Sequence, residues 1–170
     1  MPLLNRLARL RVSLGFVFAV LVFWLARPTW RSITAGAAIG LAGALIRLWA
    51  AGHLEKSREV TRSGPYRFTR HPLYAGSSVL ALGLAVGSAS PAAAAVVALY
   101  MIATITAAIR TEEAFLRERF GDAYDQYAAR RLPPSERRFS FARAWRNREY
   151  RALAGFALGI ALLGVKAALG

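Results

Sequence analysis

The residues best suited to chemistry lie in two short polar stretches that apolar sequence separates. Residues 64–76 read GPYRFTRHPLYAG and supply arginine, histidine and tyrosine side chains, and residues 110–113 read RTEE and supply two adjacent carboxylates. Together these groups offer guanidiniums for an anion, carboxylates for a cation or for hydroxyl groups, and an imidazole for proton transfer. A ligand that carries both an ammonium and a carboxylate would match this set.

The elements that must position these residues are two apolar segments, 73–88 and 91–109, joined by a short turn. Such segments pair as an antiparallel helical hairpin, so position 71 faces roughly position 108, and the two glutamates lie about one turn further out. We therefore predict that five side chains converge at one membrane surface: Arg70, His71, Tyr74, Glu112 and Glu113.

Each of these features also has a plainer explanation. The arginines of the loop would contact lipid headgroups, and its tyrosines would belong to the aromatic belt of the membrane interface. Glu112 and Glu113 would begin an exposed helix and pair with Arg117. The combination favours a site, because adjacent carboxylates repel each other and here face a basic loop that contains a histidine.

Composition and patterning indicate an integral membrane protein of the all-α class. The chain is 56% hydrophobic with a formal net charge of +14, and its apolar residues gather in blocks with arginines between them. We expect a single domain over residues 1–170, a bundle of about five transmembrane helices with cytosolic loops and a C-terminal amphipathic segment at 130–151. The expected spans are 12–30, 33–51, 73–88, 91–109 and 152–169.

The positions of arginine and lysine set the expected orientation. Nearly all of them fall before the first span, between the second and third, or between the fourth and fifth, whereas the other connections hold few. The positive-inside rule therefore predicts that the N-terminus and both polar stretches face the cytosol, in the inner membrane of a bacterium. Membrane lipids are the partners expected from this placement; the oligomeric state stays open.

The composition also argues against two classes of site. The chain has no cysteine, and His53 and His71 stand far apart without an HExxH-like spacing, so we expect no metal site. The strong positive charge would suit a nucleic-acid-binding protein, but no soluble fold remains once the apolar blocks are removed. Nucleic acid is therefore not an expected partner.

Two features inside the spans leave alternatives open. Arg47 lies about one turn from the end of its span, so it either snorkels to the interface or contacts a glutamate or a ligand. Glycines at GxxxG spacing occur at 36 and 40, at 83 and 87, and at 155 and 159. They permit close helix packing, either within the bundle or between two copies.

On residues 64–76, followed after a hairpin by Glu112 and Glu113, the chain resembles the isoprenylcysteine carboxyl methyltransferase and phospholipid methyltransferase family. The run FGDAYDQY at 120–127 is similar to a further motif of this family, and the likeness covers residues 45–134. It implies S-adenosylmethionine as the cofactor, bound in a cytosol-facing pocket. The residues implied to line that pocket are Tyr66, Arg70, His71, Tyr74 and Gly76, with Glu112 and Glu113 on polar groups of the cofactor.

The resemblance further implies methyl transfer to a lipophilic acceptor, a carboxylate or a lipid headgroup, with Arg70, His71 and Glu113 as catalytic residues. The loop before Gly64 lacks the His-x-Leu-Val pattern of many relatives, so the acceptor stays open. We expect the acceptor to reach the site sideways from the bilayer. The alternatives are an NAD(P)H-dependent membrane reductase of the sterol-reductase type and a non-catalytic lipid-binding protein.

Overall fold

The computed structural model describes residues 15–170, and within that range every regular element is a helix, as the all-α prediction requires. The helices are Gly15–Leu25, α2 (Trp30–His53), the 3-10 helix η1 (Gly64–Arg67), α3 (Pro72–Gly87), α4 (Pro91–Phe120), α5 (Asp122–Ala128), α6 (Phe141–Arg146) and α7 (Tyr150–Leu169). Arg6, Arg9, Arg11 and the start of the first predicted span lie outside the described residues.

Five apolar helices occupy the five predicted spans. Helices α2, α4 and α7 are long and apolar enough to cross a bilayer, and Gly15–Leu25 and α3 are shorter apolar helices. The first predicted span is wrong at its end, because the helix stops at Leu25 and Trp30 already belongs to α2. Pro28 interrupts the helical hydrogen bonding, and Thr29 begins α2 with a capping box to Ser32.

Helix α4 extends well past the predicted end of its span. A helix of 30 residues is about 45 Å long, whereas the hydrocarbon core of a bilayer is about 30 Å thick, so one end must project. That end carries the charged residues from Arg110 onward and stops at Gly121, whose φ is +51°. Glu112 and Glu113 therefore lie on a helical extension outside the membrane-spanning part.

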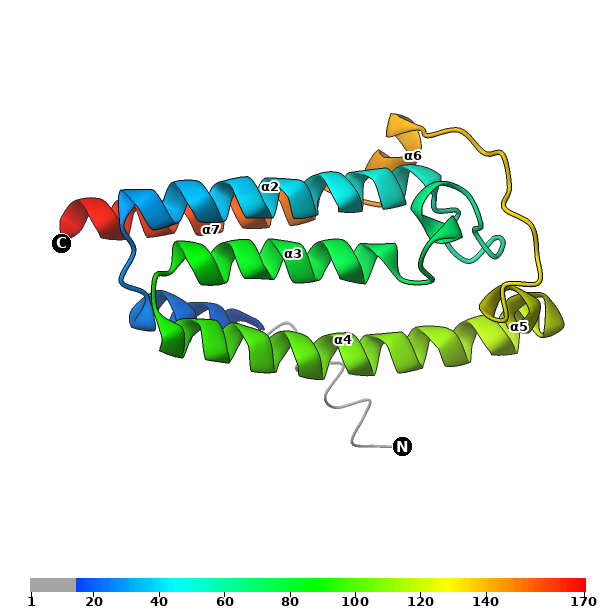
Figure 1. Cartoon of the computed structure of the whole chain (residues 1–170), viewed down its shortest axis with the longest axis horizontal. Helices are drawn as coiled ribbons and strands as arrows, with labels where there is room; N and C mark the ends of the chain where they lie inside the picture. Colours follow the sequence, from blue (N-terminus) through cyan, green and yellow to red (C-terminus); the bar gives the residue numbers. More distant parts are fainter. Residues whose placement is uncertain (1–14) are drawn as a thin grey trace.

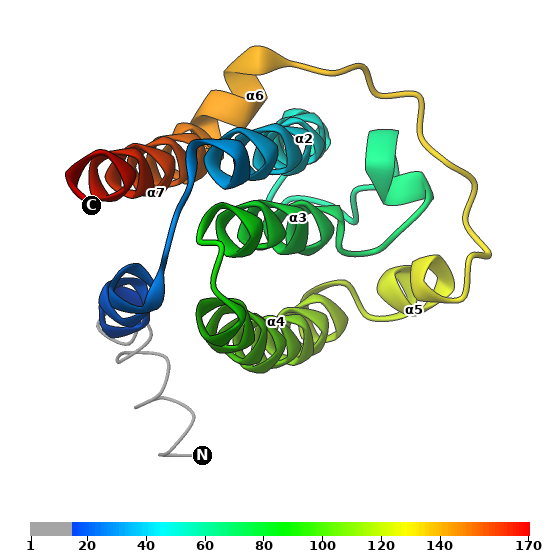
Figure 2. The ribbon, with the colours of Figure 1, turned by 60° about the vertical axis from the view of Figure 1, so that its left-hand side comes forward.

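Helix α3 lies between α2 and α4, and α7 runs alongside α2 (Figures 1 and 2). The contact between α2 and α3 is very close, since a Cβ added at Gly83 would lie 2.6 Å from the carbonyl oxygen of Gly36. The GxxxG pairs of these two helices therefore serve packing within the bundle, which is one of the two alternatives left by the sequence.

The irregular segments gather at one end of the bundle, where α2 ends, α3 begins and α4 projects (Figure 1). Both η1 and α5 lie there, and an extended connection, residues 129–140, leads from α5 to α6 (Figure 2). The predicted amphipathic segment, 130–151, thus begins as irregular chain over 131–140, continues through the short helix α6, and ends in the first residues of α7. Phe141 and Trp145 of α6 are exposed, which suits an element at a membrane surface.

Candidate active site

Glu113 is the centre of a polar cluster between the start of α3 and the projecting end of α4. Its Oε1 lies 3.1 Å from Arg70 Nη1 and 3.0 Å from His71 Nε2, and its Oε2 lies 3.4 Å from Arg117 Nη2. The Glu113 side chain is 16% exposed. The predicted convergence is confirmed for Arg70, His71 and Glu113. We call these residues, with Arg117, the Glu113 cluster.

The partners of Glu113 keep its carboxyl ionised. The hydrogen bond with His71 and the charges of Arg70 and Arg117 hold the pKa of Glu113 below its usual value, against burial, which raises it. A carboxylate only accepts hydrogen bonds, so Nε2 of His71 carries the hydrogen that it shares with Glu113. Glu113 is therefore suited to orienting His71.

The other ring nitrogen of His71, Nδ1, is buried and has no hydrogen-bond partner in the described chain. With Nε2–H donated to Glu113, Nδ1 of the neutral ring presents a lone pair. Leaving a buried polar atom unpaired costs about 1–3 kcal/mol, so native structures rarely do so without a reason. A histidine whose far nitrogen is held by a carboxylate has the arrangement of a general base.

Helix α5 brings two tyrosines to the same end of the bundle. Tyr127 donates its hydroxyl to the Tyr66 carbonyl oxygen at 2.9 Å, which fixes α5 against η1. Tyr124 is 1% exposed, and the Arg117 guanidinium lies 5.5 Å from the centroid of its ring. Burial raises the pKa of Tyr124, so its hydroxyl stays protonated, and this buried hydroxyl has no partner within residues 15–170. The motif at 120–127 was noted in the sequence, but Tyr124 was not among the predicted site residues.

Glu112 differs from its neighbour Glu113 in its contacts. No hydrogen bond or ion pair holds its carboxylate in the part of the chain that the structure describes. Its charge acts instead on the buried Tyr66: burial raises the pKa of the Tyr66 hydroxyl, and the negative charge of Glu112 raises it further. Glu112 is therefore the carboxylate of the pair that remains able to accept a cation or a hydroxyl group.

The remaining predicted residues, Tyr66, Tyr74 and Gly76, lie in different surroundings. Tyr66 is 8% exposed, and the ring of Tyr74 lies 5.8 Å from that of His71. Gly76 lies at the contact of α3 with α2, where an added Cβ would be 2.6 Å from Arg47 Cγ. Gly76 thus allows the close packing that holds the first turn of α3 in place.

Arg47 makes the glutamate contact that the sequence left as one alternative. Its guanidinium binds Glu149 through Nε and, at 3.1 Å, through Nη2, and its Nη1 donates to the Leu73 carbonyl at 3.3 Å and to the Ser77 hydroxyl. The Glu149 side chain is 5% exposed. This ion pair joins α2, the first turn of α3 and the residue before α7, and so fixes the turn that follows His71.

An apolar groove of about 560 Å³ lies between α3 and α4. Ser78 and Thr106 line the end nearest the Glu113 cluster, each about two helical turns from His71 and Glu113 respectively. Leu82 and Ile102, which also line the groove, are more than half exposed at 54% and 67%, so the groove opens to the outside of the bundle.

The fold and the cluster together define an integral membrane protein with a candidate ligand site at one end of its helical bundle. The sequence profile described as phospholipid methyltransferase matches residues 10–123. The chain therefore belongs to the phospholipid methyltransferase family, which supports methyl transfer by a membrane protein. No solved structure gives a significant match.

The chain is also similar to several curated proteins. The chain is 37% identical over 147 residues to the cobalt-zinc-cadmium resistance protein CzcN of Cupriavidus metallidurans, covering 82% of the chain and 67% of that protein. It is 38% identical over 100 residues to the nickel-cobalt-cadmium resistance protein NccN of Alcaligenes xylosoxydans, covering 58% and 46%. It is 34% identical over 76 residues to a probable protein-S-isoprenylcysteine O-methyltransferase of Oryza sativa, covering 45% and 40%.

The chain thus spans about two thirds of the length of the first relative and less than half of the other two. Two of the three names refer to metal resistance. Within residues 15–170, no three histidine, aspartate or glutamate side chains gather as a group that could hold a metal ion.

Proposed function

We propose that this chain is an S-adenosylmethionine-dependent methyltransferase for a lipophilic acceptor, with the Glu113 cluster at its active site. The observation that carries the proposal is the presence of two buried polar atoms that have no partner within residues 15–170, His71 Nδ1 and the Tyr124 hydroxyl. A network with a purely structural role satisfies its polar atoms, whereas a binding site leaves some for its ligand. Family membership and the rice relative supply the reaction class.

The polar groups fit S-adenosylmethionine, which supplies an electrophilic methyl group on a sulfonium. Glu112 would accept the ammonium or the ribose hydroxyls, because Glu113 is already shared among three partners. Arg70, whose side chain is 43% exposed, and the Tyr124 hydroxyl would donate to the carboxylate of the cofactor.

The other predicted residues would shape this pocket. Tyr66 would form a buried wall beside Glu112, and Tyr74 would form a second wall beside His71. Gly76 lies further along α3 and would act through packing on α2, which positions the turn that follows His71.

His71 is the proposed acceptor of any proton that the reaction releases. A carboxylate substrate is ionised at neutral pH and needs no base, whereas an amine or a phenol must lose a proton to react. The lone pair on Nδ1 would take that proton, and Glu113 would stabilise the positive charge that the ring then carries. Arg70 would hold the Glu113 carboxylate in position.

The groove between α3 and α4 is the proposed path of the acceptor. Its lining is almost wholly apolar, which suits a hydrocarbon chain, and the end at Ser78 and Thr106 leads toward the Glu113 cluster. A lipid chain in the groove would leave its headgroup at the membrane surface, next to His71. A strictly water-soluble acceptor would contradict this path.

We further propose that the site faces the cytosol in a bacterial inner membrane and that residues 1–170 act as one domain. The basis for the orientation is charge: the loop after α2, the end of α4 and the connection to α6 are rich in arginine, whereas the turn between α3 and α4 has none.

The first test is cofactor binding to the detergent-purified chain, measured by calorimetry with S-adenosylhomocysteine and, separately, with NADPH. We expect saturable binding of S-adenosylhomocysteine alone. Glu112→Gln removes a charge that has no ion-pair partner among the described residues, so it should weaken binding by about tenfold or more without lowering the melting temperature. Glu118→Gln is the matched control, an exposed carboxylate on the same helix, and should change neither value.

Other outcomes point elsewhere. Binding of NADPH alone would replace the proposal with a membrane reductase. Binding of neither ligand would favour a non-catalytic lipid-binding protein. Unchanged affinity in Glu112→Gln would remove Glu112 from the site while leaving the methyltransferase proposal in place.

A further inference from the structure

The two buried polar atoms at the Glu113 cluster, His71 Nδ1 and the Tyr124 hydroxyl, are covered by the chain itself. Tyr124 is 1% exposed, and its ring lies against the Arg117 guanidinium. A ligand cannot reach the Tyr124 hydroxyl from outside while every element keeps its present place. Binding that uses this hydroxyl therefore requires part of the chain to move first.

Helix α5, which carries Tyr124, is flanked at each end by a residue with positive φ. Gly121 joins it to α4 with a φ of +51°, and a Cβ added there would meet no atom of a more distant residue within 4 Å. Arg130 follows the helix with a φ of +56°, which residues other than glycine rarely adopt, and its side chain reaches the Phe68 carbonyl only at 3.5 Å. Moving segments turn about a few terminal residues of this kind, which absorb the change in backbone angles.

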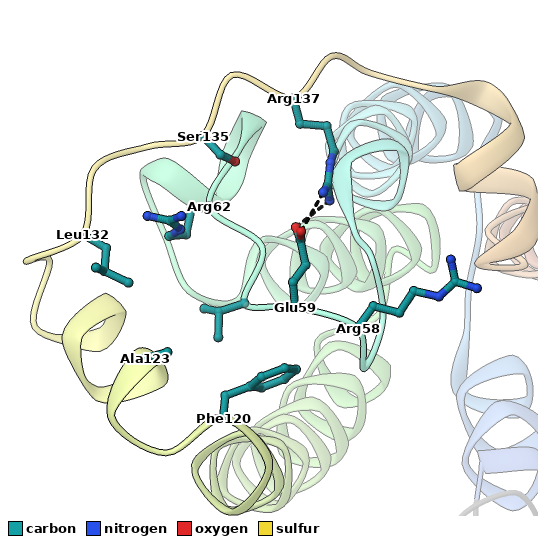
Figure 3. A pocket seen from close by; sticks show the side chains of 9 residues that line it. Arg58, Glu59, Arg62, Phe120, Ala123, Leu132, Ser135 and Arg137 are labelled. Carbon is teal, nitrogen blue, oxygen red and sulfur yellow. Dashed lines mark hydrogen bonds and ion pairs between the residues drawn. The ribbon is translucent and has the colours of Figure 1, made fainter.

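Open space lies beside α5. A cavity of about 520 Å³ is enclosed by the junction of α4 with α5, the loop after α2 and the connection 129–140 (Figure 3). Ala123 of α5 borders this space, together with Phe120 and Leu132. Among the described helices α5 packs chiefly on α4, and it lies at the projecting end of α4, away from α7 (Figures 1 and 2). Helix α5 can therefore turn without displacing the packed helices α2, α3 and α7.

Side-chain contacts hold α5 in its present place against η1 and α4. Tyr127 donates its hydroxyl to the Tyr66 carbonyl at 2.9 Å. Arg117 lies 3.2 Å from Asp125 Oδ1 through its Nε, and both side chains of this ion pair are about half exposed. A neutral hydrogen bond and an exposed ion pair each contribute little, so these contacts can open and close again readily.

We infer that α5 is a lid over the Glu113 cluster, which turns outward about Gly121 and Arg130 to admit the ligand and closes to bring the Tyr124 hydroxyl onto it. The hydrogen bond of Tyr127 is the latch of the closed position. This bond is the same with and without ligand, so it sets the rates of entry and exit and leaves the affinity unchanged. The identity of the ligand rests on the proposed function, whereas the movement rests on the hinges, the cavity and the contacts of α5.

The first measurement is the binding kinetics of S-adenosylhomocysteine to the detergent-purified full chain, by surface plasmon resonance. Tyr127→Phe removes the latch, so it should raise the association and dissociation rates alike, by about fivefold, and leave their ratio unchanged. Asp125→Asn removes the exposed ion pair and should raise both rates by about twofold. Tyr150→Phe is the matched control, because this hydroxyl makes no hydrogen bond within residues 15–170 and lies outside α5; it should change neither rate.

The second measurement needs no ligand. Hydrogen–deuterium exchange of the free chain reports how often the amides of α5 open to solvent. In Tyr127→Phe the exchange of α5 should rise by about the same fivefold, whereas that of α3 should stay as it is. Asp125 is 60% exposed, so Asp125→Asn keeps both measurements informative if Tyr127→Phe lowers the melting temperature strongly.

The outcomes separate the lid from the proposed function. If S-adenosylhomocysteine binds but its rates are unchanged in both variants, or if a slower association accompanies a weaker affinity, the lid is overturned and the proposed function stands. If S-adenosylhomocysteine does not bind the unmodified chain, the proposed function fails and hydrogen exchange alone decides. A rise confined to α5 then supports the lid, and unchanged exchange of α5 overturns it.

Discussion

Two carboxylates near the same end of the bundle each bind arginine, yet their surroundings differ. Glu149 is 5% exposed and takes both of its contacts from Arg47, whose remaining Nη1 donates to the Leu73 carbonyl and the Ser77 hydroxyl. Glu113 is 16% exposed and is shared by two arginines and a histidine. The first network is closed, because its charges are matched one to one. The second is branched: Glu113 is shared among three donors, and one of them, Arg117, also pairs with Asp125 at 3.2 Å.

The difference extends to the atoms nearby. Among the buried side-chain nitrogen and oxygen atoms of residues 15–170, two lack a hydrogen-bond partner: His71 Nδ1 and Tyr124 Oη. His71 contacts Glu113, and Tyr124 contacts Arg117, so both atoms belong to residues at the Glu113 cluster. By contrast, Asn147 on the Glu149 side donates to the carbonyls of Ala51 and Leu54 at 2.9 Å each. The Glu149 region therefore holds helices together, and we propose that the Glu113 region keeps polar atoms for a ligand.

Of the effects that distinguish the two regions, we expect the largest to be the loss of stability in Glu149→Gln. Removing one partner leaves the Arg47 guanidinium charged and mostly buried, and breaking a buried ion pair in this way costs about 3–5 kcal/mol. We expect a clear fall in the free energy of unfolding of the detergent-purified chain, measured by denaturant titration.

The matched control replaces both partners with apolar residues, Arg47→Met together with Glu149→Leu, because burial of two apolar side chains carries no such penalty. This double variant should recover most of the lost stability. An unchanged denaturation midpoint in Glu149→Gln would contradict the structural role of this region, since Glu149 would then not hold the helices together.

The sequence predicted the Glu113 region better than the Glu149 region, for a geometric reason. A short turn joins α3 to α4, so the register of the hairpin places His71 next to the glutamates once both helices are assumed. No such constraint links Arg47 to Glu149, because their helices are far apart in the chain. The sequence could therefore offer a glutamate contact for Arg47 but could not name its partner.

Tyr124 was missed for a related reason. Its place depends on how α5 turns back after Gly121, whose φ of +51° redirects the chain, and periodicity does not encode that turn. The segment 130–151 was likewise expected to be an amphipathic stretch, and the sequence did not show that its first part, 131–140, forms no helix and is held by side chains from elsewhere, such as Arg62 on the Pro133 carbonyl. Long-range contacts of this kind determine the conformation of segments whose local sequence pattern does not.

A smaller effect is expected in the pH dependence of stability, because the ionisation of Glu113 contributes to it. Its pKa is lowered in the folded chain, first by the hydrogen bond with His71, so the folded state binds a proton less readily than the unfolded state. The stabilisation is therefore complete above the usual glutamate pKa of 4.5 and is lost as the pH falls through the lower folded value. Denaturant titrations between neutral and acidic pH should show this loss, and Glu113→Gln should remove that part of the slope. An identical pH profile in the variant would mean that the cluster does not bind the carboxylate in this way.

The smallest effect, and the most selective one, compares two tyrosines of the same helix. Tyr127→Phe removes a hydroxyl that donates to the Tyr66 carbonyl, so it should lower stability by about 1 kcal/mol. Tyr124→Phe removes a buried hydroxyl that has no partner within residues 15–170, so the folded chain should be as stable as before or slightly more stable.

Ligand binding should reverse this ranking. If the Tyr124 hydroxyl is kept for a ligand, Tyr124→Phe should weaken binding of S-adenosylhomocysteine by roughly tenfold, which corresponds to one hydrogen bond to a charged group. Tyr127→Phe should retain the affinity. Calorimetry and denaturant titration on the same two variants therefore separate a residue that supports the fold from one that serves the site. Equal losses of stability in both variants would show that Tyr124 is another structural residue, and the contrast between the two regions would then rest on His71 and Glu112.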